Sequence, residues 1–343
     1  MQTAAPQNVL AEYTFLSSTV SVQPVHSAES FSGAKIWRLT DQGDCFCLRQ
    51  WPPSHPDMPR LQLIHATLRQ WAADGLTFIP APLPNRHGQT IVHHDHLLYE
   101  VTPWMPGKPV APDSVDRNQV CQAMSAMGQI HASANRMTTL VRTEVPLGIR
   151  LRHQGLSELC EANWIQRLKH AMLANPFQLD AALVRLALPL LEAACRPAPA
   201  LMNESNAVQG VPMRVFPCAR DIWWDHVLFQ DDMVSGVIDF GSLQIDTPAV
   251  DLARYLSSIR LAIGNDWSFA FAAYRNRHPL SLDEERLVRL LASINPVLSA
   301  ANWLKWLFLD GKTFPNSTAV HQRLHDLAKQ LETASATNEP DVL

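Results

Sequence analysis

The chain lacks the charge pattern of proteins that bind nucleic acid or anionic membranes. Its 28 lysines and arginines are outnumbered by 32 aspartates and glutamates, which gives a formal net charge of −4 and a pI of about 6.4. A main partner of either kind usually requires a basic surface. We therefore expect neither nucleic acid nor a membrane as partner, and we expect a small-molecule substrate.

Long apolar runs and paired cysteines are also missing. No apolar run reaches the roughly 18 residues that a membrane-spanning helix needs, and the N-terminal residues carry neither a run of positive charge nor an apolar segment. The six cysteines are scattered and none forms a Cys-x-x-Cys pair, which predicts free thiols. These absences predict a cytoplasmic protein, and they leave its oligomeric state open.

The first part of the chain is rich in strand-like segments. With 343 residues, 47% of them hydrophobic, the chain is long enough for one large or two moderate domains. Residues 34–40 and 45–51 flank the turn-rich Asp41-Gln42-Gly43-Asp44, and 90–93 and 97–102 flank a second turn, so both pairs predict hairpins. Between them, residues 60–73 have apolar side chains at helical spacing.

Helical patterns dominate after the proline-rich segment 103–107, which we interpret as a hinge. Helices are predicted at 119–134, 157–174, 180–194, 248–263, 267–275, 282–309 and 320–334, interrupted only by one hairpin near residue 230. The expected architecture is a two-lobed α+β fold, with a small antiparallel sheet in lobe 1–103 and a helical lobe 104–334. Residues 335–343 are expected to form a disordered tail.

Two aspartates frame that late hairpin. Asp221 lies in a polar loop before the strand-like segment 227–229, and Asp239 directly follows the segment 237–238 and precedes a glycine. Phosphoryl transfer needs one carboxylate to accept the proton of the attacking hydroxyl and another to hold magnesium. We predict Asp221 as the base and Asp239 as the metal ligand. The alternative is that each carboxylate only caps a turn.

The motif Arg220 to Phe229, followed by Ile238-Asp239-Phe240-Gly241 and Asp251-Leu252-Ala253, resembles the aminoglycoside phosphotransferase and choline kinase group of small-molecule kinases. The resemblance spans most of the chain and is strongest from Asp221 to Asp251. It implies a protein-kinase-like fold, ATP as donor, magnesium as metal and a hydroxyl acceptor. It also implies that Asp251 braces the catalytic loop, although an acid near a helix start is favoured anyway, and that His131 is a structural residue nearby.

The same resemblance implies which residues hold the nucleotide: Ser32, Gly33, Arg49, Glu100 and Thr102. Arg49 stands where the family usually has a lysine that pairs with a glutamate of the following helix. Arginine keeps the charge and can contact phosphate oxygens with two nitrogens. The helix 60–73 has no glutamate, so we expect Arg49 to lack this ion-pair partner.

His226 stands where the family has a metal-binding asparagine. Imidazole is a poor magnesium ligand, so either Asp225 supplies an oxygen or His226 acts through water or phosphate. Together with the changes around Arg49, this departure leaves a second hypothesis, a catalytically impaired pseudokinase that binds nucleotide or serves as a scaffold.

Three tryptophans are candidates for the acceptor pocket. Trp223 and Trp224 lie inside the catalytic loop, where they either line that pocket or pack the loop against the helices. Trp303 shares helical spacing with Trp306, which favours a core position over contact with the acceptor.

Overall fold

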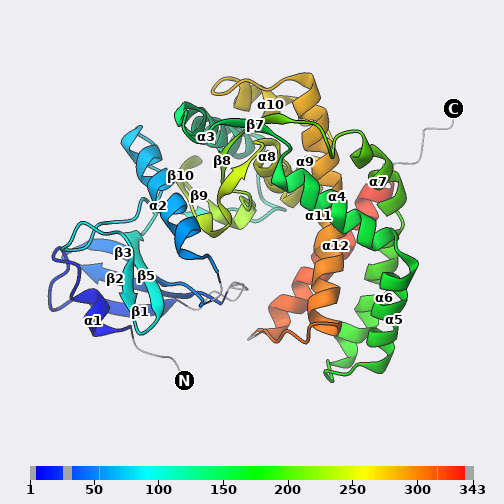
Figure 1. The fold of residues 1–343 in the computed structure, drawn as a ribbon, viewed down its shortest axis with the longest axis horizontal. Helices are drawn as coiled ribbons and strands as arrows, with labels where there is room; N and C mark the ends of the chain where they lie inside the picture. The colour runs from blue at the N-terminus through cyan, green and yellow to red at the C-terminus, as the bar shows by residue number, and fades with distance from the viewer. Residues whose placement is uncertain (1–4, 26–32, 54, 315, 337–343) are drawn as a thin grey trace.

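The computed structural model describes residues 5–25, 33–53, 55–314 and 316–336. Figure 1 shows the strands of the N-terminal part at one end of the molecule and the long helices of the C-terminal part at the other. The α+β fold predicted from the sequence is confirmed, with an antiparallel sheet first and a larger helical part after it.

The N-terminal sheet has five strands in the order β1-β2-β3-β5-β4, and every neighbouring pair is antiparallel. Both predicted hairpins are present, β2–β3 and β4–β5. In the first, Gln42 and Gly43 adopt φ of 51° and 94°, as a tight two-residue turn requires. Alternate side chains of β2, β3 and β5 form a small core with residues in and around α1. The bounds are α1 Gln7–Leu10, β1 Ser21–Val25, β2 Lys35–Asp41, β3 Asp44–Gln50, β4 Val92–His94 and β5 Leu97–Pro103.

Helix α2, Met58–Ala73, connects the sheet to the rest of the molecule. The Asp57 side chain accepts a hydrogen bond from the Arg60 N–H at 3.0 Å and so caps the helix start. Its apolar face belongs to the larger core, and the ring of Trp71 packs edge-on against Phe240 with centroids 5.7 Å apart. This contact matters because Phe240 follows Asp239 directly.

The C-terminal part contains most of the helices. Its longest helix is α11, which begins with a capping box formed by Ser281 and Glu284. Among the described residues α11 is the one helix long and apolar enough to cross a membrane. However, 61% of its apolar 18-residue stretch is buried inside the protein, as in a core helix. The bounds are α3 Arg117–Arg136, α4 Leu147–Cys160, α5 Ala162–Ala174, α6 Ala181–Cys195, α7 Ala198–Asn206, α8 Ala249–Ser258, α9 Arg260–Ile263, α10 Ser268–Arg275, α11 Leu282–Phe308 and α12 Ser317–Ala336.

Several predicted boundaries here were wrong. The expected helix 157–174 is two helices, α4 and α5, that meet at Glu161, whose extended backbone breaks the helix. The expected helix 248–263 also divides, at Ile259. Helix α7 was not predicted.

The prediction that only one hairpin interrupts the helices is wrong as well, because a second small sheet is present with the order β11-β8-β7. Its strands are short, so their apolar periodicity is weak. They are β7 Arg142–Glu144, β8 Met213–Cys218 and β11 Gln244–Asp246.

The segment predicted as a hinge is attached to the site hairpin. Strand β6, Lys108–Pro109, pairs with β9, Val227–Gln230, which pairs in turn with β10, Met233–Val237. Gly107 has φ of 91°, and a Cβ there would lie 2.5 Å from the Phe229 carbonyl oxygen, so only glycine fits. The chain therefore enters the helical part along the hairpin that carries the candidate site. At the C-terminus α12 reaches Ala336, so residues 335 and 336 of the predicted tail are helical, and 337–343 lie outside the described residues.

Candidate active site

The loop that carries Asp221 follows β8 and leads through a short 3-10 helix, Trp224–His226, into β9. Arg220, just before Asp221, has φ of 69°, a left-handed conformation that is unfavourable for arginine. The carboxylate of Asp251 in α8 holds this conformation, because it accepts hydrogen bonds from the N–H groups of Ala219 at 3.0 Å and Arg220 at 2.5 Å. Asp221 itself is open to solvent, with 42% of its side chain exposed.

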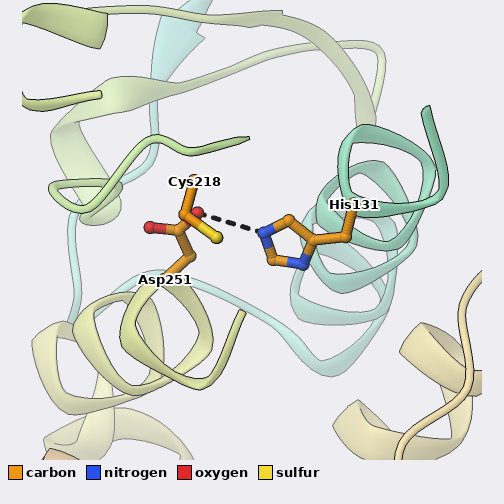
Figure 2. Close-up of side chains that lie close together, drawn as sticks. All are labelled: His131, Cys218 and Asp251. Atoms are coloured by element: carbon orange, nitrogen blue, oxygen red, sulfur yellow. Dashed lines mark hydrogen bonds and ion pairs between the residues drawn. The ribbon is translucent and has the colours of Figure 1, made fainter. Parts of the chain in front are cut away.

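A buried cluster of His131, Cys218 and Asp251 lies next to this loop and contacts it through Asp251. Figure 2 shows the imidazole of His131 directed at the Asp251 carboxylate, and the Nε2–Oδ2 distance is 3.0 Å. The Nδ1 atom of His131 lies 2.8 Å from the hydroxyl of Tyr274, and the Cys218 thiol donates to the Asp246 carbonyl at 3.3 Å.

The atoms of this cluster lie close enough to hold a metal ion, but their chemistry does not favour one. Burial raises the pKa of Cys218 well above its usual value, so the sulfur stays a protonated thiol rather than a thiolate ligand. The imidazole and the carboxylate already hydrogen-bond each other and their neighbours. We interpret the cluster as a brace for the loop that carries Asp221.

Asp239 lies directly beyond β10 in a left-handed conformation, with φ of 63°. Its Oδ1 atom lies 3.0 Å from Nη1 of Arg49, and 39% of its side chain is exposed. Burial of the carboxyl favours its neutral form, but the Arg49 guanidinium and a hydrogen bond from the Gly241 N–H outweigh burial and lower the pKa of Asp239 to about 2. The group is therefore a carboxylate at neutral pH, as a magnesium ligand must be.

His226 connects the two segments that carry the aspartates. Its Nδ1 donates to the backbone carbonyl of Asp221 at 2.8 Å, and its Nε2 accepts the indole N–H of Trp223 at 2.9 Å. A carbonyl oxygen only accepts and an indole N–H only donates, so these contacts assign a neutral imidazole with its proton on Nδ1. Nε2 is 3.7 Å from Oδ2 of Asp239, but its lone pair is already engaged.

His226 is thus a positioning group in this structure rather than a free ligand for metal. The carboxylate of Asp225 does not complete a trio with Asp239 and His226. In the described ranges the one set of three potential ligands within 4.8 Å of one another is the buried cluster of Figure 2. Burial also raises the pKa of Asp225.

Arg49 has carboxylate partners on both sides. Besides Asp239, its Nε lies 3.6 Å from Oε1 of Glu100 in the neighbouring strand β5, and its guanidinium stacks over Trp51 at 4.7 Å. The other oxygen of Glu100 lies 2.5 Å from Nε2 of His65 in α2. Arg49 thus has no glutamate partner on the helix, as expected, but it is paired through other elements. The helix provides a histidine, and the glutamate comes from the sheet.

Comparisons with known proteins identify the family of this chain. The sequence model described as the phosphotransferase enzyme family matches residues 22–291. The chain belongs to this family. A search of curated proteins found no significant match.

Solved phosphotransferases share the family fold with this chain. An aminoglycoside phosphotransferase from Alicyclobacillus acidocaldarius is 17% identical with a TM-score of 0.62, and the alignment covers 98% of this chain and 96% of that chain. A spectinomycin phosphotransferase in complex with ADP and spectinomycin is 14% identical with a TM-score of 0.62, with 92% of each chain covered. A microcompartment-associated aminopropanol kinase is 16% identical with a TM-score of 0.58, covering 96% of this chain and 97% of that one. At these identities the likeness shows the fold.

The remaining predicted residues of this phosphotransferase lie in different surroundings. Gly33 is exposed, with φ of 75°, whereas Ser32 lies outside the described residues. Thr102 is 9% exposed in β5, opposite Cys47 in β3, which leaves little of its side chain open to a nucleotide. Trp303 is 4% exposed and stacks with Trp306 and Phe314 at centroid distances of 5.4 and 5.0 Å, so it is a core residue and does not line an acceptor pocket.

Trp223 and Trp224 form an edge-on pair in the loop, with centroids 5.3 Å apart. The backbone N–H of Trp224 donates to the Ser258 hydroxyl at 3.0 Å, so this residue secures the loop to α8. Trp223 instead contacts the groups around Asp221.

Sequence reasoning missed two polar residues of the site. Arg254 of α8 donates from Nε to Oδ1 of Asp221 at 2.8 Å, and His65 holds Glu100. The spacing Asp251-x-x-Arg254 places both side chains on neighbouring positions of one helix face, and that pattern was the available signal for Arg254. His65 is one of three polar options on the helix, with Gln62 and Gln70, but its spacing does not identify Glu100 as its partner.

Proposed function

We propose that this protein is an ATP- and magnesium-dependent kinase of a hydroxyl group on a small molecule, with Asp221 as base and Asp239 as metal ligand. The observation that carries the proposal is the bridge made by His226. Its Nδ1 donates to the Asp221 carbonyl at 2.8 Å, and its own backbone carbonyl accepts the N–H of Ile238, the residue before Asp239, at 2.9 Å, so one residue sets the relative position of both segments.

The exposed carboxylate of Asp221 is suited to accept a proton. Arg254 engages its Oδ1, and Oδ2 has no hydrogen-bond partner among the described residues. In the proposed step the acceptor hydroxyl oxygen forms a bond to the γ-phosphorus while the bond from that phosphorus to the β–γ bridging oxygen breaks. The hydroxyl proton passes to Asp221 and then to solvent, and ADP leaves. Orientation of the hydroxyl by Asp221 contributes as much as its basicity.

The residues around Asp239 fit one magnesium ion. The carboxylate is ionised and partly exposed, and Arg49 lies beside it as a donor for phosphate oxygens. When bound, the ion would neutralise charge on the transferred phosphoryl group. A second protein-held ion lacks support, because Nε2 of His226 is engaged by Trp223.

The proposal is tested by an Asp221→Asn variant. We expect ADP release in the presence of acceptor to fall at least about 100-fold, in line with the contribution of a general base, while nucleotide affinity stays within twofold. The matched control is Asp231→Asn at the tip of the β9–β10 hairpin, where the side chain is exposed and asparagine tolerates the positive φ. Turnover that is unchanged in Asp221→Asn would exclude this residue as the base.

The pseudokinase hypothesis predicts a different pattern. Of the three departures that suggested it, one is removed, because Glu100 and His65 supply the ion-pair network of Arg49. A pseudokinase would bind nucleotide with or without magnesium and release no ADP in either the native protein or Asp221→Asn. The same assay therefore separates the two hypotheses.

A further inference from the structure

The indole of Trp223 engages an imidazole nitrogen that lies beside the proposed metal ligand. The Trp223 N–H donates to Nε2 of His226 at 2.9 Å, and the two rings meet edge-on with centroids 5.5 Å apart. The same Nε2 lies 3.7 Å from Oδ2 of Asp239, and 12% of the His226 side chain is exposed. The indole therefore occupies the ring lone pair of His226 that faces the proposed metal ligand.

In all other respects His226 is arranged like a histidine that binds metal. Such a histidine binds the ion through one ring nitrogen and donates the N–H of the other to a backbone carbonyl or a carboxylate. Here Nδ1 donates to the Asp221 carbonyl at 2.8 Å, which leaves the lone pair on Nε2. Bonds from Zn²⁺ to nitrogen and to carboxylate oxygen are each about 2.1 Å, so one ion of this kind can reach both Nε2 and Oδ2 of Asp239. Without the indole, His226 and Asp239 would offer a nitrogen and an oxygen ligand to a transition metal.

Trp223 is held in place from several sides. The guanidinium carbons of Arg254 and Arg323 each lie 5.4 Å from its ring centroid, and Trp224 packs edge-on against it at 5.3 Å. Its backbone carbonyl accepts the N–H of His226 at 2.9 Å, so the two residues are joined through both main chain and side chain. Rotation of the indole away from Nε2 would therefore cost packing contacts as well as a hydrogen bond.

Divalent metals differ in how they respond to an accessible imidazole. Magnesium prefers oxygen ligands, whereas Zn²⁺, Ni²⁺ and Co²⁺ gain affinity from nitrogen ligands. At sites that contain nitrogen, the later transition metals bind more tightly, so a protein selects among ions through the type of ligand that it presents. A carboxylate beside an imidazole whose lone pair is occupied presents oxygen alone, which favours magnesium.

We propose that Trp223 determines the metal selectivity of the site. Its indole N–H withholds Nε2 of His226 from the ion, so that Asp239 acts without a nitrogen ligand and the site takes magnesium in preference to transition metals. This inference rests on the proposed role of Asp239 as metal ligand, and it names the residue that sets which ions this ligand binds. Because Trp223 acts through His226, it is a positioning residue.

The first test is calorimetry of Co²⁺ and Mg²⁺ binding to protein saturated with a non-hydrolysable ATP analogue. Trp223→Phe keeps an aromatic ring but has no N–H, so it frees Nε2 of His226. We expect the affinity for Co²⁺ to rise at least about tenfold in this variant, while the affinity for Mg²⁺ stays within about twofold. Trp224→Phe is the matched control, because it removes the neighbouring indole N–H and leaves the donor to His226 in place. Urea unfolding curves check that the variants are folded.

The X-ray absorption spectrum of the bound Co²⁺ identifies the ligand. Scattering from an imidazole should be present in Trp223→Phe and absent from the double variant that also carries His226→Asn. Because the double variant keeps every other histidine, it also accounts for Co²⁺ bound elsewhere on the protein. The native protein should give the same spectrum as the double variant.

Two results would overturn the inference. Imidazole scattering in the native protein beyond that of the double variant would show that the indole yields Nε2 to the metal, and this result does not depend on the folding of Trp223→Phe. A Co²⁺ affinity in folded Trp223→Phe that equals the native value would show that the indole does not control the ligand. If the native protein binds no Mg²⁺ with the nucleotide analogue, the proposed kinase function fails, whereas Co²⁺ binding by Trp223→Phe still decides the role of the indole.

Discussion

Replacement of Asp251 by alanine should destabilise the protein and disable the catalytic loop together. The carboxylate accepts from three donors, the N–H groups of Ala219 and Arg220 and Nε2 of His131, and both Asp251 and His131 are 0% exposed. A buried donor left without a partner costs about 1–3 kcal/mol, and three donors lose their partner here. Since the losses are coupled, we expect the free energy of unfolding to fall by about 4 kcal/mol.

Urea unfolding followed by tryptophan fluorescence measures this loss, and ADP release measures the effect on turnover. A protein of ordinary stability, about 5–15 kcal/mol, would remain mostly folded after such a change. Asp251→Asn keeps one acceptor oxygen and should cost about half as much. Asp310→Asn, at an exposed aspartate, is the control. A loss below about 1 kcal/mol for Asp251→Ala, or turnover within twofold of the native protein, would refute the bracing role.

Three further variants probe other parts of the site. His65→Leu removes the donor to Glu100 and should raise the KM for ATP about tenfold, because Glu100 then no longer holds Arg49 in place. His65→Gln can still donate and should keep most of the affinity. Equal KM values in the two variants would contradict the role of the His65–Glu100–Arg49 contacts. Arg49→Met removes the largest of the effects that oppose burial at Asp239, and burial is the largest effect of all, so the pKa of that carboxyl, about 2 in the native protein, should rise above its ordinary value of about 3.9. Magnesium-dependent nucleotide binding should then decline between pH 7 and 5 in the variant but not in the native protein, and parallel pH profiles would count against this assignment. Gly107→Ala, at φ of 91°, should lower the midpoint of urea unfolding by an amount that corresponds to about 3 kcal/mol. A loss within experimental error would contradict the close contact between Gly107 and the Phe229 carbonyl.

The parts of the fold that follow from local patterns were predictable from the sequence. The turn at Asp41–Asp44 and the apolar spacing of α2 and α11 predict their elements, because turn geometry and helical burial act over a few residues. Strands β7, β8 and β11 could not be predicted in this way. They are short, and their pairings join segments about 70 and 30 residues apart, so their stability depends on tertiary contacts.

The candidate site also combines residues that local motifs identify with contacts that depend on tertiary structure. Asp221, Asp239 and Asp251 are found by motif, because the chain keeps the family spacing around them. The partner of Arg49 was not predicted because the resemblance places a glutamate on the helix, while in this chain Glu100 of β5 occupies the required space and His65 of α2 secures it. Only coordinates show such an exchange between neighbouring elements.

Calorimetry of ATP binding with and without magnesium tests whether Asp239 is the magnesium ligand of a working kinase site. The native protein and Asp239→Asn are compared under the same conditions. We expect magnesium to increase the affinity of the native protein for ATP at least about tenfold, and we expect the variant to lose this increase. Equal affinities with and without magnesium in the native protein, or an increase that survives in Asp239→Asn, would show that Asp239 does not hold the metal.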